Sequence, residues 1–164
     1  MNTRKVCMLG DFGVGKTSLV ARFVSSVFSD KYLTTVGAKI DTKQVDLGNG
    51  NGVKLVVWDL AGGAEVTPQV KMYLRGATGY LLVIDGTRAN TLATARDLKE
   101  AADTLIPGKP GVVLLNKNDL RDQWEVSDAD IEALRADGFI VFETSAKTGE
   151  SVEEAFQRLA EAVQ

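Results

Sequence analysis

The sequence predicts a three-layer α/β fold, in which a mostly parallel six-stranded sheet ends in one antiparallel edge strand. Apolar runs rich in β-branched residues indicate strands buried on both faces, at 5–9, 54–58, 79–84, 111–115 and 139–142. Segments with helical periodicity lie between most of them, at 16–25, 89–105, 127–136 and 151–163. Such alternation is typical of a parallel sheet with helices on both faces.

The antiparallel strand comes from a predicted hairpin. Residues 38–47 and 53–58 flank the glycine-rich "GNGNG" at 48–52, which reads as a hairpin turn. This places 38–47 at an edge of the sheet.

Two helix starts carry capping signals. Thr87 follows the strand at 79–84 and is a candidate cap for the next helix. Ser151 and Glu154 have the spacing of a capping box before the last helix.

Length and composition indicate one globular domain, residues 1–164. A chain of 164 residues buries roughly 70% of the surface that its unfolded form exposes. It has 45% hydrophobic and 25% charged residues and a formal charge of −3, which argues against nucleic acid as a partner. The single cysteine, Cys7, lies in the apolar run "VCML" and is expected to be a buried thiol, so no disulfide forms within the chain.

Targeting signals are not evident in the sequence. The first ten residues contain no long apolar segment, and no stretch approaches the ~20 apolar residues of a membrane span. The second residue is Asn2 rather than the glycine that myristoylation needs, and "RLAEAVQ" at the end contains no cysteine for prenylation. We therefore expect a cytoplasmic protein without a direct lipid anchor.

A phosphate-binding motif follows the first strand. "GDFGVGKT", residues 10–17, satisfies G-x-x-x-x-G-K-[ST] and opens a helix. Its glycines allow backbone N–H groups to surround a phosphate, and the helix N-terminus adds partial positive charge. Lys16 is expected at the β- and γ-phosphates and the Thr17 hydroxyl at Mg²⁺. The alternative is a glycine turn with an exposed lysine.

The loop "NKND", residues 116–119, follows another buried strand. A carboxylate at Asp119 can accept hydrogen bonds from N1–H and the 2-amino group of guanine, whereas adenine has an acceptor at N1. Asn116 can tie the loop to the phosphate loop, and the Lys117 stem can lie over the base. In isolation this motif is weak, and a solvated loop is the alternative.

The loop "ETSAKTG", residues 143–149, follows the last strand. Ser145, Ala146 and Lys147 supply a backbone N–H for guanine O6 and a second lysine beside the base. A helix-capping role is compatible with this function.

Together these motifs resemble the small GTPases of the Ras superfamily, and the switch regions resemble its Rab-like branch. The resemblance runs from "GDFGVGKT" through "DKYLTTVG", "WDLAGG" and "NKND" to "TSAK". It implies a Ras-like G domain of the P-loop NTPase fold that binds GTP or GDP with Mg²⁺, hydrolyses GTP and cycles between two states. The host stays open, because a prokaryotic Ras-like protein would lack a lipidated tail, as would a truncated chain.

The resemblance also assigns nucleotide-binding residues. Phe28 resembles the aromatic residue that packs on guanine, with a plain core role as the alternative, and Tyr32 resembles the residue that covers the phosphates. The implied nucleotide-binding set is Asp11, Phe12, Gly13, Val14, Gly15, Lys16, Thr17, Ser18, Phe28, Tyr32, Thr35, Gly62, Asn116, Lys117, Asp119, Ser145, Ala146 and Lys147.

The implied metal ligands are Thr17, Thr35 and Asp59, the last usually acting through water. Thr34 is the alternative to Thr35. The Gly62 N–H resembles the group that contacts the γ-phosphate of GTP. Lys16, Thr35 and Gly62 are the residues that the family uses around the reacting phosphate.

The implied partners are proteins. Ile40, Trp58 and Tyr73 resemble the apolar triad beside the Rab switches and predict an effector patch, although Trp58 can also be plain packing at a strand end. Activating and exchange proteins are implied as well.

Two positions depart from the family. The residue after D-x-x-G is usually a glutamine that orients the attacking water, and here it is Gly63, followed by Ala64. The departure predicts slow hydrolysis without a partner, because positioning is most of what the protein contributes to phosphoryl transfer. Glu65 is a possible substitute. Phe12 stands where the family commonly has a small residue; it either blocks an incoming arginine or packs harmlessly against switch II.

Two other functional classes are weighed against the switch. The first is a nonhydrolysing scaffold with permanently bound GTP, and Gly63 makes it the stronger of the two alternatives. A P-loop kinase shares the phosphate loop, but nothing in the sequence indicates its arginine-bearing lid.

Overall fold

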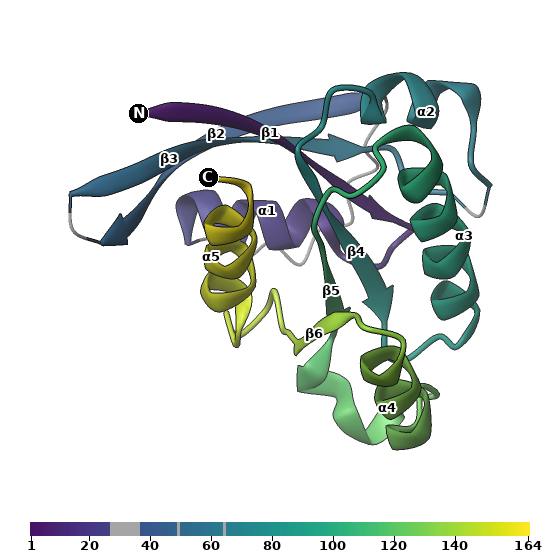
Figure 1. Ribbon diagram of the computed structural model, residues 1–164. Coiled ribbons are helices and arrows are strands. Elements are labelled where there is room, and N and C mark those ends of the chain that lie inside the picture. Colours follow the sequence, from purple (N-terminus) through teal and green to yellow (C-terminus); the bar gives the residue numbers. More distant parts are fainter. Residues whose placement is uncertain (27–36, 49, 64) are drawn as a thin grey trace.

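The structure is a computed structural model that describes residues 1–26, 37–48, 50–63 and 65–164. Its centre is a six-stranded sheet in the order β2-β3-β1-β4-β5-β6 (Figure 1). The strands are β1 (Asn2–Gly10), β2 (Ala38–Gly48), β3 (Asn51–Leu60), β4 (Gly79–Asp85), β5 (Gly111–Asn116) and β6 (Ile140–Glu143). Every neighbouring pair is parallel except β2 with β3, which confirms the predicted fold and the hairpin.

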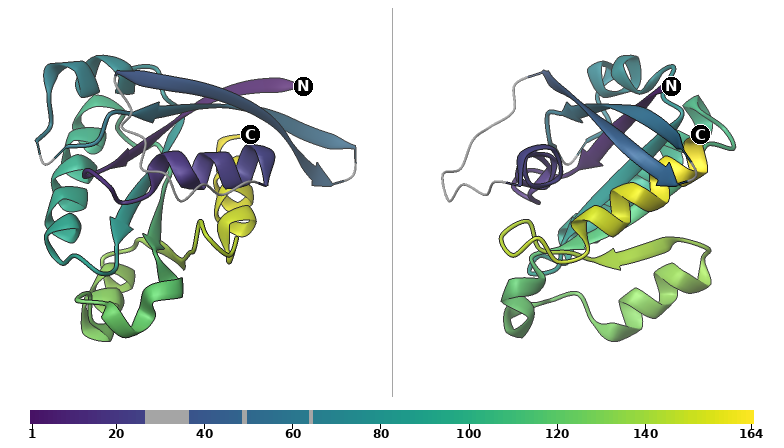
Figure 2. Two further views of the ribbon diagram at one scale, coloured as in Figure 1. Left: turned by 180° about the vertical axis from the view of Figure 1, so that it is seen from behind. Right: turned by 90° about the vertical axis from the view of Figure 1, so that its left-hand side faces the viewer.

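Helices cover both faces of this sheet, as two views of the ribbon show (Figure 2). They are α1 (Lys16–Ser25), α2 (Pro68–Leu74), α3 (Asn90–Leu105), α4 (Asp128–Ala136) and α5 (Val152–Val163), with a short 3-10 helix η1 at Asn118–Gln123. The apolar side chains of α1 and α5 form one core with the sheet, and those of α2, α3 and α4 form another. The chain therefore has three layers.

Strand alternation separates the two cores. In β1, Val6 and Met8 face α1 and α5, whereas Cys7 and Leu9 face the opposite layer. This period of two places apolar side chains on both faces, as a central parallel strand requires. Cys7 is fully buried, as predicted, and burial raises the pKa of its thiol to about 12.

Both predicted helix caps are wrong. Ser151 precedes α5, but its backbone is left-handed (φ 57°) and its side chain makes no capping hydrogen bond. Side-chain caps require an extended backbone at this position, which points the hydroxyl at the first N–H groups. Thr87 is not a cap because α3 begins at Asn90 after Ala89, and the Thr87 hydroxyl instead donates to Asp85 at 2.7 Å.

The capping box that the structure shows lies at α4. Ser127 accepts from the Asp130 N–H at 3.1 Å, and the Asp130 carboxylate accepts from the Ser127 N–H at 2.9 Å. Helix α2 was not predicted, since its seven residues are too short to show a clear period. It begins with Pro68 after the cap Thr67, which accepts from the Val70 N–H at 3.2 Å.

No helix within the described ranges has the length and apolar character needed to cross a membrane.

Candidate functional site

The phosphate-binding motif forms the turn between β1 and α1. Gly13 and Gly15 adopt positive φ angles of 67° and 103°, a region that glycine enters without steric cost. A Cβ at Gly15 would lie 2.3 Å from the Asn116 side-chain nitrogen. The loop therefore needs glycine both for its own turn and for its close contact with the neighbouring loop.

Lys16 is buried at the mouth of this loop. Its side-chain nitrogen donates to the carbonyl oxygens of Gly10 and Asp11, each at 3.1 Å. Burial lowers the pKa of Lys16, and the nearby carboxylates of Asp59 and Asp11 oppose that shift. An ammonium group buried against carbonyl oxygens has a strong electrostatic preference for an anion such as a phosphate.

Thr17 and Asp59 bring two hard oxygen donors together. The Thr17 hydroxyl, in the first turn of α1, donates to the Asp59 carboxylate at 2.5 Å. Asp59 is fully buried in β3. One carboxylate and one hydroxyl beside a phosphate-binding loop suit Mg²⁺, which prefers oxygen ligands and is commonly completed by substrate phosphates and water.

The "NKND" loop contacts the phosphate loop directly. Asn116, at the end of β5, donates from its side-chain nitrogen to the Val14 carbonyl at 2.9 Å. Its side-chain oxygen accepts from the Thr144 hydroxyl and the Ala146 N–H, both at 3.2 Å. One buried amide thus joins three loops at the carboxyl edge of the sheet.

The other residues predicted to recognise the base also gather there. Asp119 accepts from the Ser145 hydroxyl at 2.7 Å, so the two loops predicted to recognise guanine meet. Arg22 of α1 donates from Nε to the Ala146 carbonyl at 2.9 Å and also contacts the Lys147 carbonyl. Ser18 lies in the first turn of α1, beside the phosphate loop.

Several predicted positions lie outside the described residues. These are Phe28, Tyr32, Thr34, Thr35 and Ala64.

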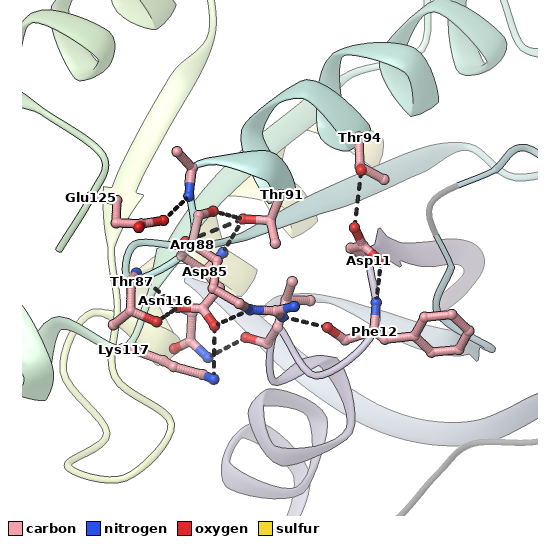
Figure 3. Close-up of polar contacts among 12 residues, drawn as sticks. Asp11, Phe12, Asp85, Thr87, Arg88, Thr91, Thr94, Asn116, Lys117 and Glu125 are labelled. Carbon is pink, nitrogen blue, oxygen red and sulfur yellow. Dashed lines mark hydrogen bonds and ion pairs between the residues drawn. The ribbon is translucent and has the colours of Figure 1, made fainter. Parts of the chain in front are cut away.

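Sequence reasoning missed a charged group at the end of β4. Asp85 is buried, and Lys117 pairs with it at 2.8 Å (Figure 3). Arg88 also pairs with Asp85, at 3.0 Å, and its guanidinium donates to the Phe12 carbonyl. Ligand-binding residues follow the carboxyl ends of parallel strands, and Asp85 obeys that rule, so its position was the signal that could have found it.

Burial raises the pKa of the Asp85 carboxyl, but hydrogen bonds outweigh that effect. They come from Lys117, Thr87 and Arg88, and the resulting pKa is below the ordinary value of 3.8. Asp85 is therefore a buried anion that accepts several hydrogen bonds and lies between the cationic side chains of Lys117 and Arg88.

Trp124 is a second residue that the sequence did not reveal. Its indole N–H donates to the Lys117 carbonyl at 2.9 Å. A Cβ at Gly86 would lie 2.1 Å from the indole, so the ring packs directly on that glycine. Lys117 has a positive φ of 73°, which is uncommon for a residue with a side chain. The hydrogen bond from the Trp124 indole to its carbonyl stabilises this backbone conformation.

Phe12 and Gly63, the two positions expected to depart from the family pattern, lie next to each other. Phe12 is 53% exposed, and a Cβ at Gly63 would lie 3.8 Å from its ring. At Gly62, in contrast, a Cβ would lie 2.7 Å from the Lys16 nitrogen and 2.8 Å from the Asp11 carbonyl. Glu65 lines a hollow with Gly63 between β1, β3 and α3.

The apolar triad gathers on adjacent elements. Ile40 of β2 pairs with Trp58 of β3 and is 50% exposed. The Trp58 ring lies 5.7 Å from the Tyr73 ring of α2, and the Lys5 ammonium lies 4.0 Å from the centre of the indole.

This fold and its loops define a phosphate-loop nucleotide-binding protein. A sequence model of the Ras family matches residues 5–164. The chain is 35% identical over 158 residues to the Ras-related protein Rab-13 of Canis lupus familiaris, covering 95% of this chain and 77% of that protein. It is 38% identical over 162 residues to the GTP-binding protein ypt5 of Schizosaccharomyces pombe (96% and 76% covered) and to the Ras-related protein Rab-31 of Homo sapiens (95% and 80%).

The chain belongs to the Ras family, and its relatives indicate a Rab-like small GTPase. It is a GTP-binding molecular switch and an enzyme that hydrolyses GTP to GDP. Proteins of this family bind guanine nucleotide, typically with Mg²⁺, and work with effectors, exchange factors and activating proteins.

Proposed function

We propose that residues 1–164 form one switch domain that binds GTP through the phosphate loop, "NKND" and "TSAK", and hydrolyses it slowly without a partner. The observation that carries the slow hydrolysis is Gly63, which offers no side chain to the attacking water and faces the ring of Phe12.

Nucleotide binding is assigned to the residues already brought together at the edge of the sheet. Lys16 would hold the β- and γ-phosphates, exchanging its carbonyl partners for phosphate oxygens. Thr17 and Asp59 would hold Mg²⁺, together with Thr35; the metal supplies charge neutralisation between the phosphates. Asp119 would select guanine over adenine, with Asn116 and Lys117 fixing the loop.

The switch would depend on contacts that only GTP makes. A side chain at Gly62 would overlap Asp11 and Lys16. Glycine at this position would therefore let the Gly62 N–H approach a γ-phosphate. Thr35 is the proposed partner from the other switch loop. Loss of the γ-phosphate removes both contacts, and an effector that prefers the GTP state would read the difference at Ile40, Trp58 and Tyr73.

Hydrolysis would be slow because two aids are missing or obstructed. A glutamine after D-x-x-G places the attacking water in line, and Gly63 cannot. The exposed ring of Phe12 lies beside Gly63 and would obstruct an arginine supplied by a partner. An activating protein would therefore have to supply its own water-positioning residue.

Single-turnover hydrolysis of preloaded GTP tests this proposal. Gly63→Gln is expected to raise the rate about tenfold or more, since its backbone is compatible with a side chain and the nearest atoms to a Cβ lie at 3.8 Å. Gly63→Ala is the matched control and should leave the rate unchanged. A wild-type rate equal to that of a glutamine-bearing relative would contradict the proposal.

A nonhydrolysing scaffold is the second candidate, and Gly63 is again the observation that favours it. Nucleotide exchange separates the two functions. A switch releases GDP when an exchange protein or chelation of Mg²⁺ stimulates it, whereas a scaffold retains the nucleotide under both treatments.

A further inference from the structure

Hydrogen bonds connect both the N–H and the carbonyl of Phe12 to α3 and to the loop before it. Its N–H donates to the Asp11 carboxylate at 2.7 Å, and the other oxygen of that carboxylate accepts from the Thr94 hydroxyl at 3.0 Å. Its carbonyl accepts from the Arg88 guanidinium, two residues before α3 begins. Figure 3 shows Arg88 and Asp11 reaching Phe12 from different sides.

Arg88 is held in turn by Asp85. One carboxylate oxygen of Asp85 takes both the Arg88 guanidinium, at 3.0 Å, and the Lys117 ammonium, at 2.8 Å. The other oxygen accepts from the N–H and hydroxyl of Thr87, at 2.9 and 2.7 Å. The side chain of Asp85 is 1% exposed, so this junction is shielded from water.

The loop that carries Arg88 is itself fixed. The Thr91 hydroxyl donates to the Arg88 carbonyl at 2.7 Å, and the Ala89 N–H donates to the Glu125 carboxylate at 2.9 Å. Arg88 is therefore presented to the phosphate loop from an anchored backbone. A guanidinium suits this place because Nε and a terminal nitrogen donate in different directions at once.

We propose that Arg88 is a positioning residue for the nucleotide, which joins the guanine side of the site, through Asp85 and Lys117, to the phosphate loop at the Phe12 carbonyl. The inference rests on the proposed nucleotide-binding function and adds to it a determinant of how long nucleotide stays bound. We call the contacts of Arg88 with the Phe12 carbonyl and with Asp85, which also pairs with Lys117, the Arg88 bridge. With this bridge in place, the phosphate loop and the "NKND" loop move together. Without it, the two loops separate more easily and the nucleotide leaves faster.

The bridge predicts a specific pattern of rates. Arg88 contacts a carbonyl on the loop, so its loss should accelerate GDP and GTP release by the same factor. It should leave the single-turnover hydrolysis rate unchanged. An arginine that acted on the γ-phosphate would show the opposite pattern, with slower hydrolysis and unequal effects on the two nucleotides.

The test measures release of fluorescent methylanthraniloyl-GDP and methylanthraniloyl-GTP from the whole chain after chasing with unlabelled nucleotide. Arg88→Gln is expected to accelerate both releases about five- to tenfold, a moderate effect because the arginine is 37% exposed. Arg88→Lys keeps the charge, but its single side-chain nitrogen cannot replace both Nε and the terminal nitrogen of the guanidinium, so it should not restore slow release. Arg96→Gln is the matched control, because Arg96 is an arginine of α3 that pairs with the exposed Asp137 and lies 5.9 Å from the centre of the Phe139 ring.

Thermal unfolding of each variant in excess GDP verifies that it is folded. Release from Arg88→Gln within twofold of wild type would overturn the proposal, as would full restoration by lysine. Slowed hydrolysis at unchanged release would also overturn it. If wild type and Arg96→Gln themselves failed to bind the labelled nucleotides, the proposed nucleotide-binding function would fail instead, which keeps the two outcomes separate.

Discussion

Gly62 and Gly63 are adjacent in sequence, yet the structure predicts that substitution by alanine is harmful at the first and tolerated at the second. A Cβ at Gly62 would meet the Lys16 nitrogen at 2.7 Å and the Asp11 carbonyl oxygen at 2.8 Å. The lysine tip can move, but the carbonyl belongs to the phosphate-loop backbone and cannot. A Cβ at Gly63 meets only the Phe12 ring, at an ordinary contact distance of 3.8 Å.

The cost of Gly62→Ala follows from this overlap. Adding a methyl group to a packed site costs about 1–3 kcal/mol, and for a chain of this size each kcal/mol lowers Tm by ~2–4 °C. We expect Tm of the GDP-bound protein to fall by about 2 to 12 °C. Gly63→Ala should change it by less than about 2 °C.

The same substitution should also impair recognition of GTP. Moving the Gly62 N–H away from the γ-phosphate loses one hydrogen bond to a charged group, ~1.5–3 kcal/mol. The ratio of GTP to GDP affinity should therefore fall about tenfold or more, whereas Gly63→Ala should leave the ratio unchanged.

Differential scanning calorimetry and competitive nucleotide titration measure these two quantities. Equal Tm values and equal affinity ratios for Gly62→Ala and Gly63→Ala would refute the reasoning, because they would mean that Gly62 has room for a side chain.

Three further predictions come from buried groups. The pKa of Asp85 is below 3.8 in the folded protein, so its carboxylate stabilises the fold above about pH 4, and this contribution is lost as pH falls through the folded pKa. In denaturant titrations, Asp85→Asn should therefore weaken the fall in the free energy of unfolding between about pH 5 and pH 3. The same pH dependence in the variant and the wild type would contradict this expectation. Gly86→Ala should push the Trp124 indole off the Lys117 carbonyl, destabilising the protein by about 1–3 kcal/mol and accelerating GDP release; an unaltered Tm would show that the ring is loosely packed. Since burial raises the pKa of Cys7 to about 12, a thiol reagent at pH 8 should label it only after denaturation, and rapid labelling of native protein would disprove the burial.

Much of the fold was predictable because five of the six strands contain a short apolar run, and the sixth, β2, precedes a glycine-rich hairpin turn. The strand expected at 79–84 is β4, Gly79–Asp85, and the expected hairpin joins β2 to β3. The contact between Asn116 and the phosphate loop was also expected and is present. Such features depend on local sequence or on the rule that loops at the carboxyl ends of parallel strands meet.

The features that sequence reasoning missed depend on distant contacts. Arg88 reaches Phe12 across 76 positions in the chain, and nothing around either residue reveals the other. The expected cap at Ser151 failed because tertiary packing put its backbone in the left-handed region, which a spacing pattern cannot show. Helix α2 is too short for its period to be distinguished from a loop.

The central claim is that this small GTPase recognises GTP well and hydrolyses it slowly. The most direct measurement is the identity of the nucleotide released when the protein, purified in Mg²⁺ without added nucleotide, is denatured and its supernatant separated by anion-exchange chromatography. A substantial fraction of GTP beside GDP is the predicted result, and Gly63→Gln prepared in parallel should carry mainly GDP. GDP alone in the wild-type protein would contradict the claim.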